Sequence, residues 1–125
     1  MIRTFFEAGK TKNFSVLSDI QLNSQEFSSF SDLPPYGLKN YSESIALEEL
    51  RFSSISDYDY EIKNERISIF GNVGIVTFVL NQSGMLVDSQ TYTGQHMTVN
   101  GRATFVLVKD DTWKIMHYHL DQIPE

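Results

Sequence analysis

Long runs of β-favouring residues, separated by short turn sequences, make up the last two-thirds of the chain. From Asp57 onward, dipeptides of the kind found in two-residue hairpin loops divide these runs. Because such loops join antiparallel neighbours, the pattern predicts a meander within one sheet. Two of the predicted strands, residues 58–70 and 85–99, are unusually long, and Gly94 is the predicted site of a β-bulge. The four predicted turns are Gly71-Asn72, Ser83-Gly84, Asn100-Gly101 and Asp110-Asp111.

The first third of the chain has helical and irregular patterns instead. Ile2, Phe5 and Phe6 recur at helical spacing and predict an amphipathic helix over residues 2–10. The segment 33–37, Leu-Pro-Pro-Tyr-Gly, predicts a loop because proline lacks an amide donor. Helices that precede an antiparallel sheet are typical of an α+β domain with the helices on one face of the sheet.

A second helix is predicted from about Tyr41 to Phe52. Asn40 is followed three residues later by Glu43, which is the spacing of a capping box at a helix start. The apolar positions that support this helix are Ile45, Leu47, Leu50 and Phe52.

Composition excludes several classes of function. The 125 residues are expected to form a single domain, residues 1–125, and the chain contains no cysteine. A disulfide scaffold, a thiolate metal site and a cysteine nucleophile are therefore excluded. The formal net charge of -6 argues against a nucleic-acid partner. Since no apolar run reaches signal-peptide or membrane-spanning length, we expect a cytoplasmic protein that does not bind a membrane.

The C-terminal part of the chain carries a recognisable series of motifs. Residues 101–109, Gly-Arg-Ala-Thr-Phe-Val-Leu-Val-Lys, are followed after a tight turn by residues 113–120, Trp-Lys-Ile-Met-His-Tyr-His-Leu. Together with the segments 27–36 and 71–77, this series resembles the SnoaL-like branch of the nuclear transport factor 2-like superfamily, also called ketosteroid isomerase-like or cystatin-like. The resemblance spans essentially the whole chain. Asp111 and Asp121 depart from the residues usual in the family, glycine and serine respectively.

The resemblance implies a cone-shaped fold, in which a strongly curved, mainly antiparallel sheet wraps around the N-terminal helices. It also implies a pocket at the open end of the cone and a homodimer formed through the outer face of the sheet. Relatives in this superfamily include isomerases, dehydratases, cyclases and assembly domains, so the fold does not determine the function. The resemblance implies no metal, and we expect no cofactor.

The four predicted turns assign residues to the two faces of the sheet, because a two-residue hairpin sets the register. One face combines aromatic and polar side chains, as expected of a ligand pocket, and we interpret it as the concave face. Arg66 is expected to contact an anionic group of a ligand, and tyrosine hydroxyls to donate hydrogen bonds. The predicted pocket residues are Arg66, Gln90, Tyr92, His96, Phe105 and Tyr118.

The opposite face is more apolar and is the predicted dimer surface. His117 and His119 project from the same face of one strand, a geometry that a two-histidine metal site requires. Structural histidines at the interface and a role in the pocket are the alternatives, and no metal is expected. The predicted dimer face contains Val76, Phe78, Val106, Trp113, Ile115 and His117.

Three hypotheses for the function follow. The leading hypothesis is a cofactor-free SnoaL-like domain that dimerises and holds a small organic molecule, with an acid among the candidates. The second is an isomerase, cyclase or dehydratase acting by proton transfer, with His96 as the base and Tyr92 or Tyr118 as the donor. The third is a structural assembly domain without a ligand.

Overall fold

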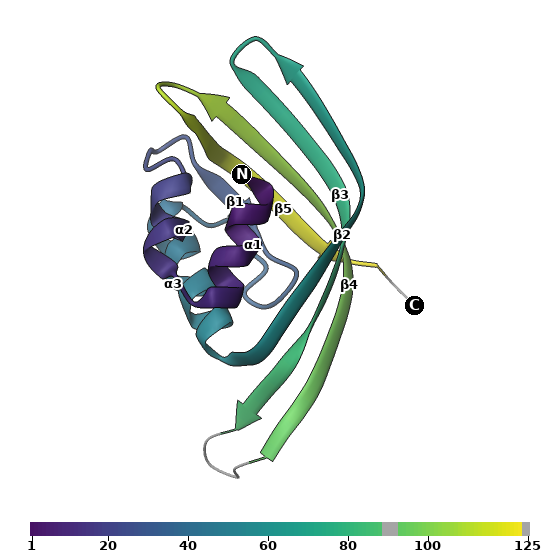
Figure 1. The fold of residues 1–125 in the computed structure, drawn as a ribbon. Helices are drawn as coiled ribbons and strands as arrows, with labels where there is room; N and C mark the ends of the chain where they lie inside the picture. Colours follow the sequence, from purple (N-terminus) through teal and green to yellow (C-terminus); the bar gives the residue numbers. More distant parts are fainter. Residues whose placement is uncertain (89–92, 124–125) are drawn as a thin grey trace.

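The fold is a curved five-stranded sheet with three helices against its concave face (Figure 1). The computed structural model describes residues 1–88 and 93–123. The strand order is β1-β5-β4-β3-β2, and only the β1–β5 pair is parallel among the described strands. The elements are α1 (Ile2–Thr11), α2 (Phe14–Ile20), β1 (Ser28–Phe30), α3 (Tyr41–Ser53), β2 (Ile55–Phe70), β3 (Val73–Asp88), β4 (Thr93–Lys109) and β5 (Trp113–Gln122). This architecture confirms the predicted fold class.

Both predicted helices are present. The apolar residues of α1, which include Ile2, Phe5 and Phe6, are buried against the sheet. The capping box at the start of α3 is confirmed, because the Asn40 side chain accepts from the Glu43 amide at 2.9 Å. In return the Glu43 carboxylate accepts from the Asn40 amide at 3.0 Å. These two bonds satisfy amides that would otherwise lack a partner in the first turn.

Only one of the predicted two-residue turns has the expected form. Phe70 pairs with Val73, so Gly71-Asn72 is a two-residue hairpin loop in which Gly71 adopts a φ of 62°. The last connection is one residue longer than predicted, because Lys109 pairs with Trp113. The connection between β3 and β4 falls within residues 89–92, outside the described part of the chain.

The predicted turns at Ser83-Gly84 and Asn100-Gly101 are wrong, because both dipeptides lie inside long strands. Ser83 pairs with Thr98, and Asn100 pairs with Asn81. Gly84 and Gly101 allow neighbouring strands of the sheet to approach closely and do not form turns. A Cβ atom on Gly84 would lie 2.3 Å from Ile55 Cγ2, and one on Gly101 would lie 2.4 Å from the Asp121 carbonyl oxygen.

These differences in register correct the predicted faces of the sheet. The β3–β4 register runs without a shift from Val73–Val108 to Asp88–Thr93, so there is no bulge at Gly94. The irregularity lies in β5, where Leu107 pairs with Ile115 but Val106 pairs with His117. This bulge places Ile115 and Tyr118 on the same concave face. The strand residues of the core are Ile55, Tyr58, Val76, Phe78, Leu80, Ala103, Phe105, Ile115, Tyr118 and Leu120.

The close approach at Gly101 has a measurable consequence. We expect Gly101→Ala to lower the free energy of unfolding by about 1–3 kcal/mol, since backbone atoms of β5 must move to admit the methyl group. Urea denaturation followed by circular dichroism measures this loss. Gly37→Ala is the matched control, because a Cβ there meets no atom within 4 Å. Equal stability of the two variants would contradict the packing role assigned to Gly101.

Candidate functional site

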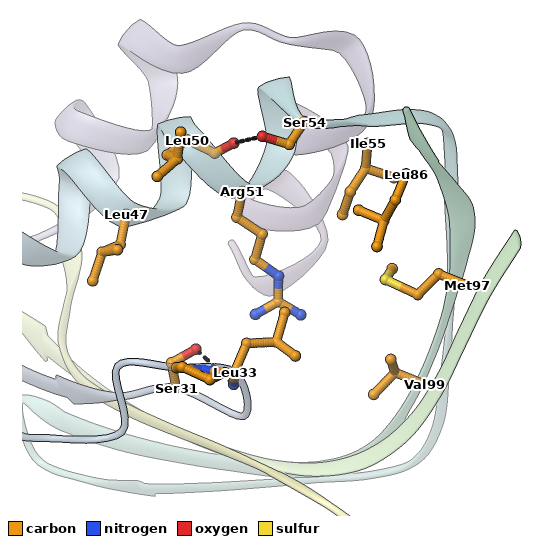
Figure 2. A pocket seen from close by; sticks show the side chains of 11 residues that line it. Ser31, Leu33, Leu47, Leu50, Arg51, Ser54, Ile55, Leu86, Met97 and Val99 are labelled. Carbon is orange, nitrogen blue, oxygen red and sulfur yellow. Dashed lines mark hydrogen bonds between the residues drawn. The ribbon is translucent and has the colours of Figure 1, made fainter. Parts of the chain in front are cut away.

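A cavity of about 360 Å³ opens between α3, the segment after β1, the last part of β3 and the first part of β4 (Figure 2). Its size lies within the range of pockets that hold small organic ligands. Aliphatic and thioether side chains form most of its wall, and Arg51 supplies its only charged side chain among the described residues. The lining residues are Ser31, Leu33, Pro34, Leu47, Leu50, Arg51, Ser54, Ile55, Leu86, Met97 and Val99.

Arg51 extends from α3 into this apolar cavity (Figure 2). Its guanidinium forms an ion pair with Asp32, with Nη1 and Oδ1 2.7 Å apart, and the Asp32 side chain is only 2% exposed. A second guanidinium nitrogen, Nη2, donates to Gln82 Oε1 at 3.4 Å. The same Gln82 oxygen accepts from the Tyr58 hydroxyl at 2.7 Å. Arg51 is therefore held by partners from two different segments, and Tyr58 of β2 bonds to one of these partners.

Two donors of this group lack a partner. Arg51 Nε and Gln82 Nε2 are buried, and neither has a hydrogen-bond acceptor among the described residues. Burying a donor without an acceptor costs about 1–3 kcal/mol, so such groups are rare in native structures. Tyr58 remains a neutral donor, because burial raises the pKa of its hydroxyl well above the usual value. The polar part of the site therefore has an excess of N–H donors.

Arg51 was not among the predicted site residues, because the prediction of α3 rested on its apolar positions. Leu50, one of those positions, is 63% exposed at the mouth of the cavity. The buried residues of the helix are Ser44, Glu48 and Phe52, which are spaced four residues apart. Counting back in steps of four from Phe52 would have found this face, although two of its three members are polar.

A second polar group lies deeper, between α3, β1 and β5. Glu48 accepts hydrogen bonds from Ser44 Oγ at 2.9 Å, from Gln21 Nε2 at 2.5 Å and from the Tyr118 hydroxyl. Ser29 Oγ lies 2.9 Å from Ser44 Oγ and extends the network to β1. Neither Glu48 nor Tyr118 lines the cavity.

Burial raises the pKa of Glu48 to about 7. The hydrogen bonds from Tyr118, Gln21 and Ser44 and the charge of Arg51 act in the opposite direction but do not cancel the cost of desolvation. Tyr118 is also fully buried, and both burial and the neighbouring Glu48 carboxylate raise the pKa of its hydroxyl. Near neutral pH, Glu48 is thus divided between its protonated and ionised forms, while Tyr118 stays protonated.

The structure does not bring the predicted pocket residues together. Arg66 and His96 are exposed on the outer face of the sheet, whereas Phe105 and Tyr118 are buried in the core beneath the helices. These four residues do not line the cavity. Gln90 and Tyr92, the other two, lie outside the described residues. The misplaced turns explain the errors at Arg66 of β2 and His96 of β4, because a shifted register exchanges the two faces.

The predicted dimer face is also divided by the observed register. Val76, Phe78 and Ile115 belong to the core instead, and Trp113 lies on the same concave side near Gly74. Val106 and His117 remain on the outer face and are half-buried. Most residues of the predicted dimer surface therefore lie on the concave face, because the observed register differs from the predicted one.

His117 and His119 both lie on the outer face, but in different surroundings. His117 Nδ1 lies 2.8 Å from Ser28 Oγ, and burial lowers the pKa of the His117 ring. The His119 ring is exposed and lies against Phe30, with ring centroids 5.5 Å apart. The described residues contain no group of three or more potential ligands arranged to hold a metal ion.

Comparison with known proteins places this geometry in a family. The SnoaL-like domain model matches residues 1–124. The chain belongs to the SnoaL-like family. No curated protein matches the sequence. None of the helices in the described part of the chain is long and apolar enough to cross a membrane.

Solved structures with the same fold share little sequence with this SnoaL-like domain. A provisionally assigned dehydratase of the nuclear transport factor 2-like family from Streptomyces avermitilis has a TM-score of 0.83 and 18% identity, covering 98% of this chain and 92% of that one. The association domain of CaMKII from C. elegans has a TM-score of 0.71 and 18% identity, covering 97% and 89%. A provisionally assigned ketosteroid isomerase from Shewanella frigidimarina has a TM-score of 0.70 and 17% identity, covering 96% and 90%. These likenesses confirm the predicted nuclear transport factor 2-like fold.

The raised pKa of Glu48 predicts how stability depends on pH. The folded state holds the proton more tightly than the unfolded state, where the ordinary pKa is near 4.5. The stabilising contribution of the proton is therefore complete below pH 4.5 and lost as the pH rises toward 7, a change of about 3 kcal/mol. Urea denaturation at pH 5 and pH 8 should show this difference in the wild type and not in Glu48→Gln. Glu49→Gln, at an exposed neighbouring position, should retain the wild-type dependence; a Glu48→Gln variant that also retains it would refute this role.

The Arg51–Asp32 ion pair predicts a strong dependence on both partners. We expect Arg51→Met to lower the free energy of unfolding by about 3–5 kcal/mol, because it leaves the buried Asp32 carboxylate without a counter-charge. The double variant Arg51→Met/Asp32→Asn should recover most of this loss. Arg102→Met, which breaks the exposed pair with Asp121, should cost less than about 1 kcal/mol. Similar losses of stability in Arg51→Met and Arg102→Met would show that burial does not determine how much an ion pair contributes to the free energy of unfolding.

Proposed function

We propose that this SnoaL-like domain binds a small, mainly apolar organic molecule in the cavity beside α3. The supporting observation is one cationic side chain inside a pocket whose remaining wall is mainly aliphatic (Figure 2). An apolar pocket with few polar groups provides affinity through burial and orientation through the polar contact. Arg51, rather than Arg66, is the residue that orients the ligand.

The chemistry of Arg51 defines the polar end of this ligand. A guanidinium has donors and no acceptor, so it contacts a ligand through an acceptor oxygen. Asp32 already offsets the charge of Arg51, and the ligand therefore need not be anionic to avoid an unbalanced charge. Organic acids and neutral carbonyl compounds both carry a suitable oxygen. One structural neighbour is provisionally named for a ketosteroid, which is consistent with a carbonyl-bearing organic ligand.

The proton-transfer alternative has less support from the site. His96 is exposed on the outer face of the sheet, and Tyr118 lies in the core with Glu48. A general base must come within hydrogen-bond reach of the proton that it removes. Glu48 has a suitable pKa but does not line the cavity. Binding is therefore the function that this geometry supports best.

A thermal-shift screen with organic acids and carbonyl compounds tests binding. A ligand at a hundred times its dissociation constant stabilises the folded state by about 2.7 kcal/mol, which corresponds to a rise of several degrees in Tm. Met97→Trp places a larger side chain in the cavity wall and should abolish the shift. Met85→Trp is the matched control, since Met85 lies on the opposite face of the same hairpin. A shift that persists unchanged in Met97→Trp would place the ligand elsewhere.

A further inference from the structure

The outer edge of β2 is a free strand edge. β2 is the last strand of the sheet, and no other described strand pairs with its outer side. A free edge presents backbone amides and carbonyls that can pair with another chain. Proteins usually protect such edges with bulges and charged side chains, and β2 has this protection over only part of its length.

The first two-thirds of β2 are well protected. The register with β3 shifts between Ser56 and Asp59 and again between Lys63 and Arg66. Asp57 and Asn64 adopt positive φ values of 52° and 55° at these two irregularities. Asp57, Asp59 and Glu61 add three acidic side chains to this stretch. Bulges and like charges both oppose pairing with a second strand.

The last five residues of β2, Arg66–Phe70, contain no bulge, and Arg66 at the start of the segment is their only charged side chain. Their register with β3 is continuous from Arg66–Thr77 to Phe70–Val73. The side chains of Ile67, Ile69 and Phe70 are 60%, 62% and 67% exposed. The β2–β3 hairpin that carries them extends beyond the helices at the top of Figure 1. This segment is a regular, apolar and uncovered strand edge.

We propose that Arg66–Phe70 pairs with the same segment of a second copy of this chain, in antiparallel orientation about Ser68. Phe70 and Val73 close a two-residue hairpin, so alternate residues from Phe70 direct their backbone groups toward β3. Ile67 and Ile69 direct their backbone amides and carbonyls toward the free edge of β2. A two-fold axis at Ser68 sets Ile67 opposite the partner's Ile69, and their outward amides and carbonyls then pair.

The side chains of the segment are compatible with this self-pairing. Ile67 and Ile69 lie on the concave side, where they pair with Val76 and Gly74 of β3, and the two copies would form one apolar cluster there. On the outer side, Arg66 would face Phe70 of the partner subunit, a favourable cation–aromatic arrangement. Lys63, Glu65 and Arg66 give this end of β2 a small positive charge within a chain of net charge -6. Two copies therefore repel each other less at this end than at the acidic beginning of β2.

This surface differs from the dimer face expected from the sequence. A contact through the outer face of the sheet would cover Ile75 and Val106 but leave Ile67 and Ile69 in water. Edge pairing instead covers Ile67 and Ile69 and joins two sheets into one. Substitutions on the two surfaces can therefore separate the two modes of association.

A single cysteine tests the proposed axis, since the chain has none of its own. Ser68 would lie opposite the partner's Ser68 in a non-hydrogen-bonded pair, where Cα atoms are about 4.5 Å apart and a disulfide can form. We expect Ser68→Cys to yield a covalent dimer on mild oxidation, measured by non-reducing electrophoresis. Glu61→Cys, on the same strand outside the segment, should remain monomeric. Equal cross-linking of the two variants would overturn the proposed register.

Sedimentation equilibrium tests the association without a cross-link. The wild type should dimerise as its concentration rises, Ile69→Lys should lose the dimer, and Ile75→Lys should keep it. Far-UV circular dichroism checks that each variant remains folded, which both exposed positions favour. A wild type that stays monomeric up to millimolar concentration would overturn the proposal. Loss of the dimer in Ile75→Lys with retention in Ile69→Lys would overturn it in favour of the outer face.

Discussion

Burial of polar side chains on the inner face of α3 is the constraint on which the rest of the structure depends. A helix that buries Ser44 and Glu48 and encloses most of the Arg51 side chain can occupy the hollow of the sheet only where every charge finds a partner. Those partners come from β1, the segment that follows it, β3 and β5. Their side chains set the position and rotation of α3. The cavity lies beside Arg51, where aliphatic side chains of β3 and β4 face the helix.

The sequence was sufficient for the elements with strong local signals and insufficient for the faces of the sheet. The capping box at Asn40 and the hairpin at Gly71 were predictable because each depends on residues only a few positions apart. Gly84 and Gly101 have the same local signature as Gly71, but they serve close packing between distant segments. The bulge at Ile115 has no local signal at all. Arg51 and Glu48 escaped prediction because polar side chains on the inner face of a helix do not follow the rule that buried faces are apolar.

The cavity and the proposed pairing segment lie at opposite ends of the sheet. Ile55 and Leu86, which line the cavity, form a pair at one end of the β2–β3 ladder, and Phe70 and Val73 close the other end. A strand of sixteen residues is about 50 Å long at roughly 3.3 Å per residue. Pairing through Arg66–Phe70 would therefore leave the mouth of the cavity open, and each copy would keep an independent site.

The parallel contact between β1 and β5 has a consequence for how the chain folds during synthesis. It joins Ser28 to His117 and Phe30 to His119, so the first strand of the chain completes the sheet only beside the last. Phe5 and Phe6, which emerge from the ribosome early, pack against aromatic residues of β3, β4 and β5 that emerge much later. Until then α1 has only its contacts with α2, α3 and β2 to cover its apolar residues, and helices this short are marginal alone. Native structure must therefore form cooperatively, once β5 is available.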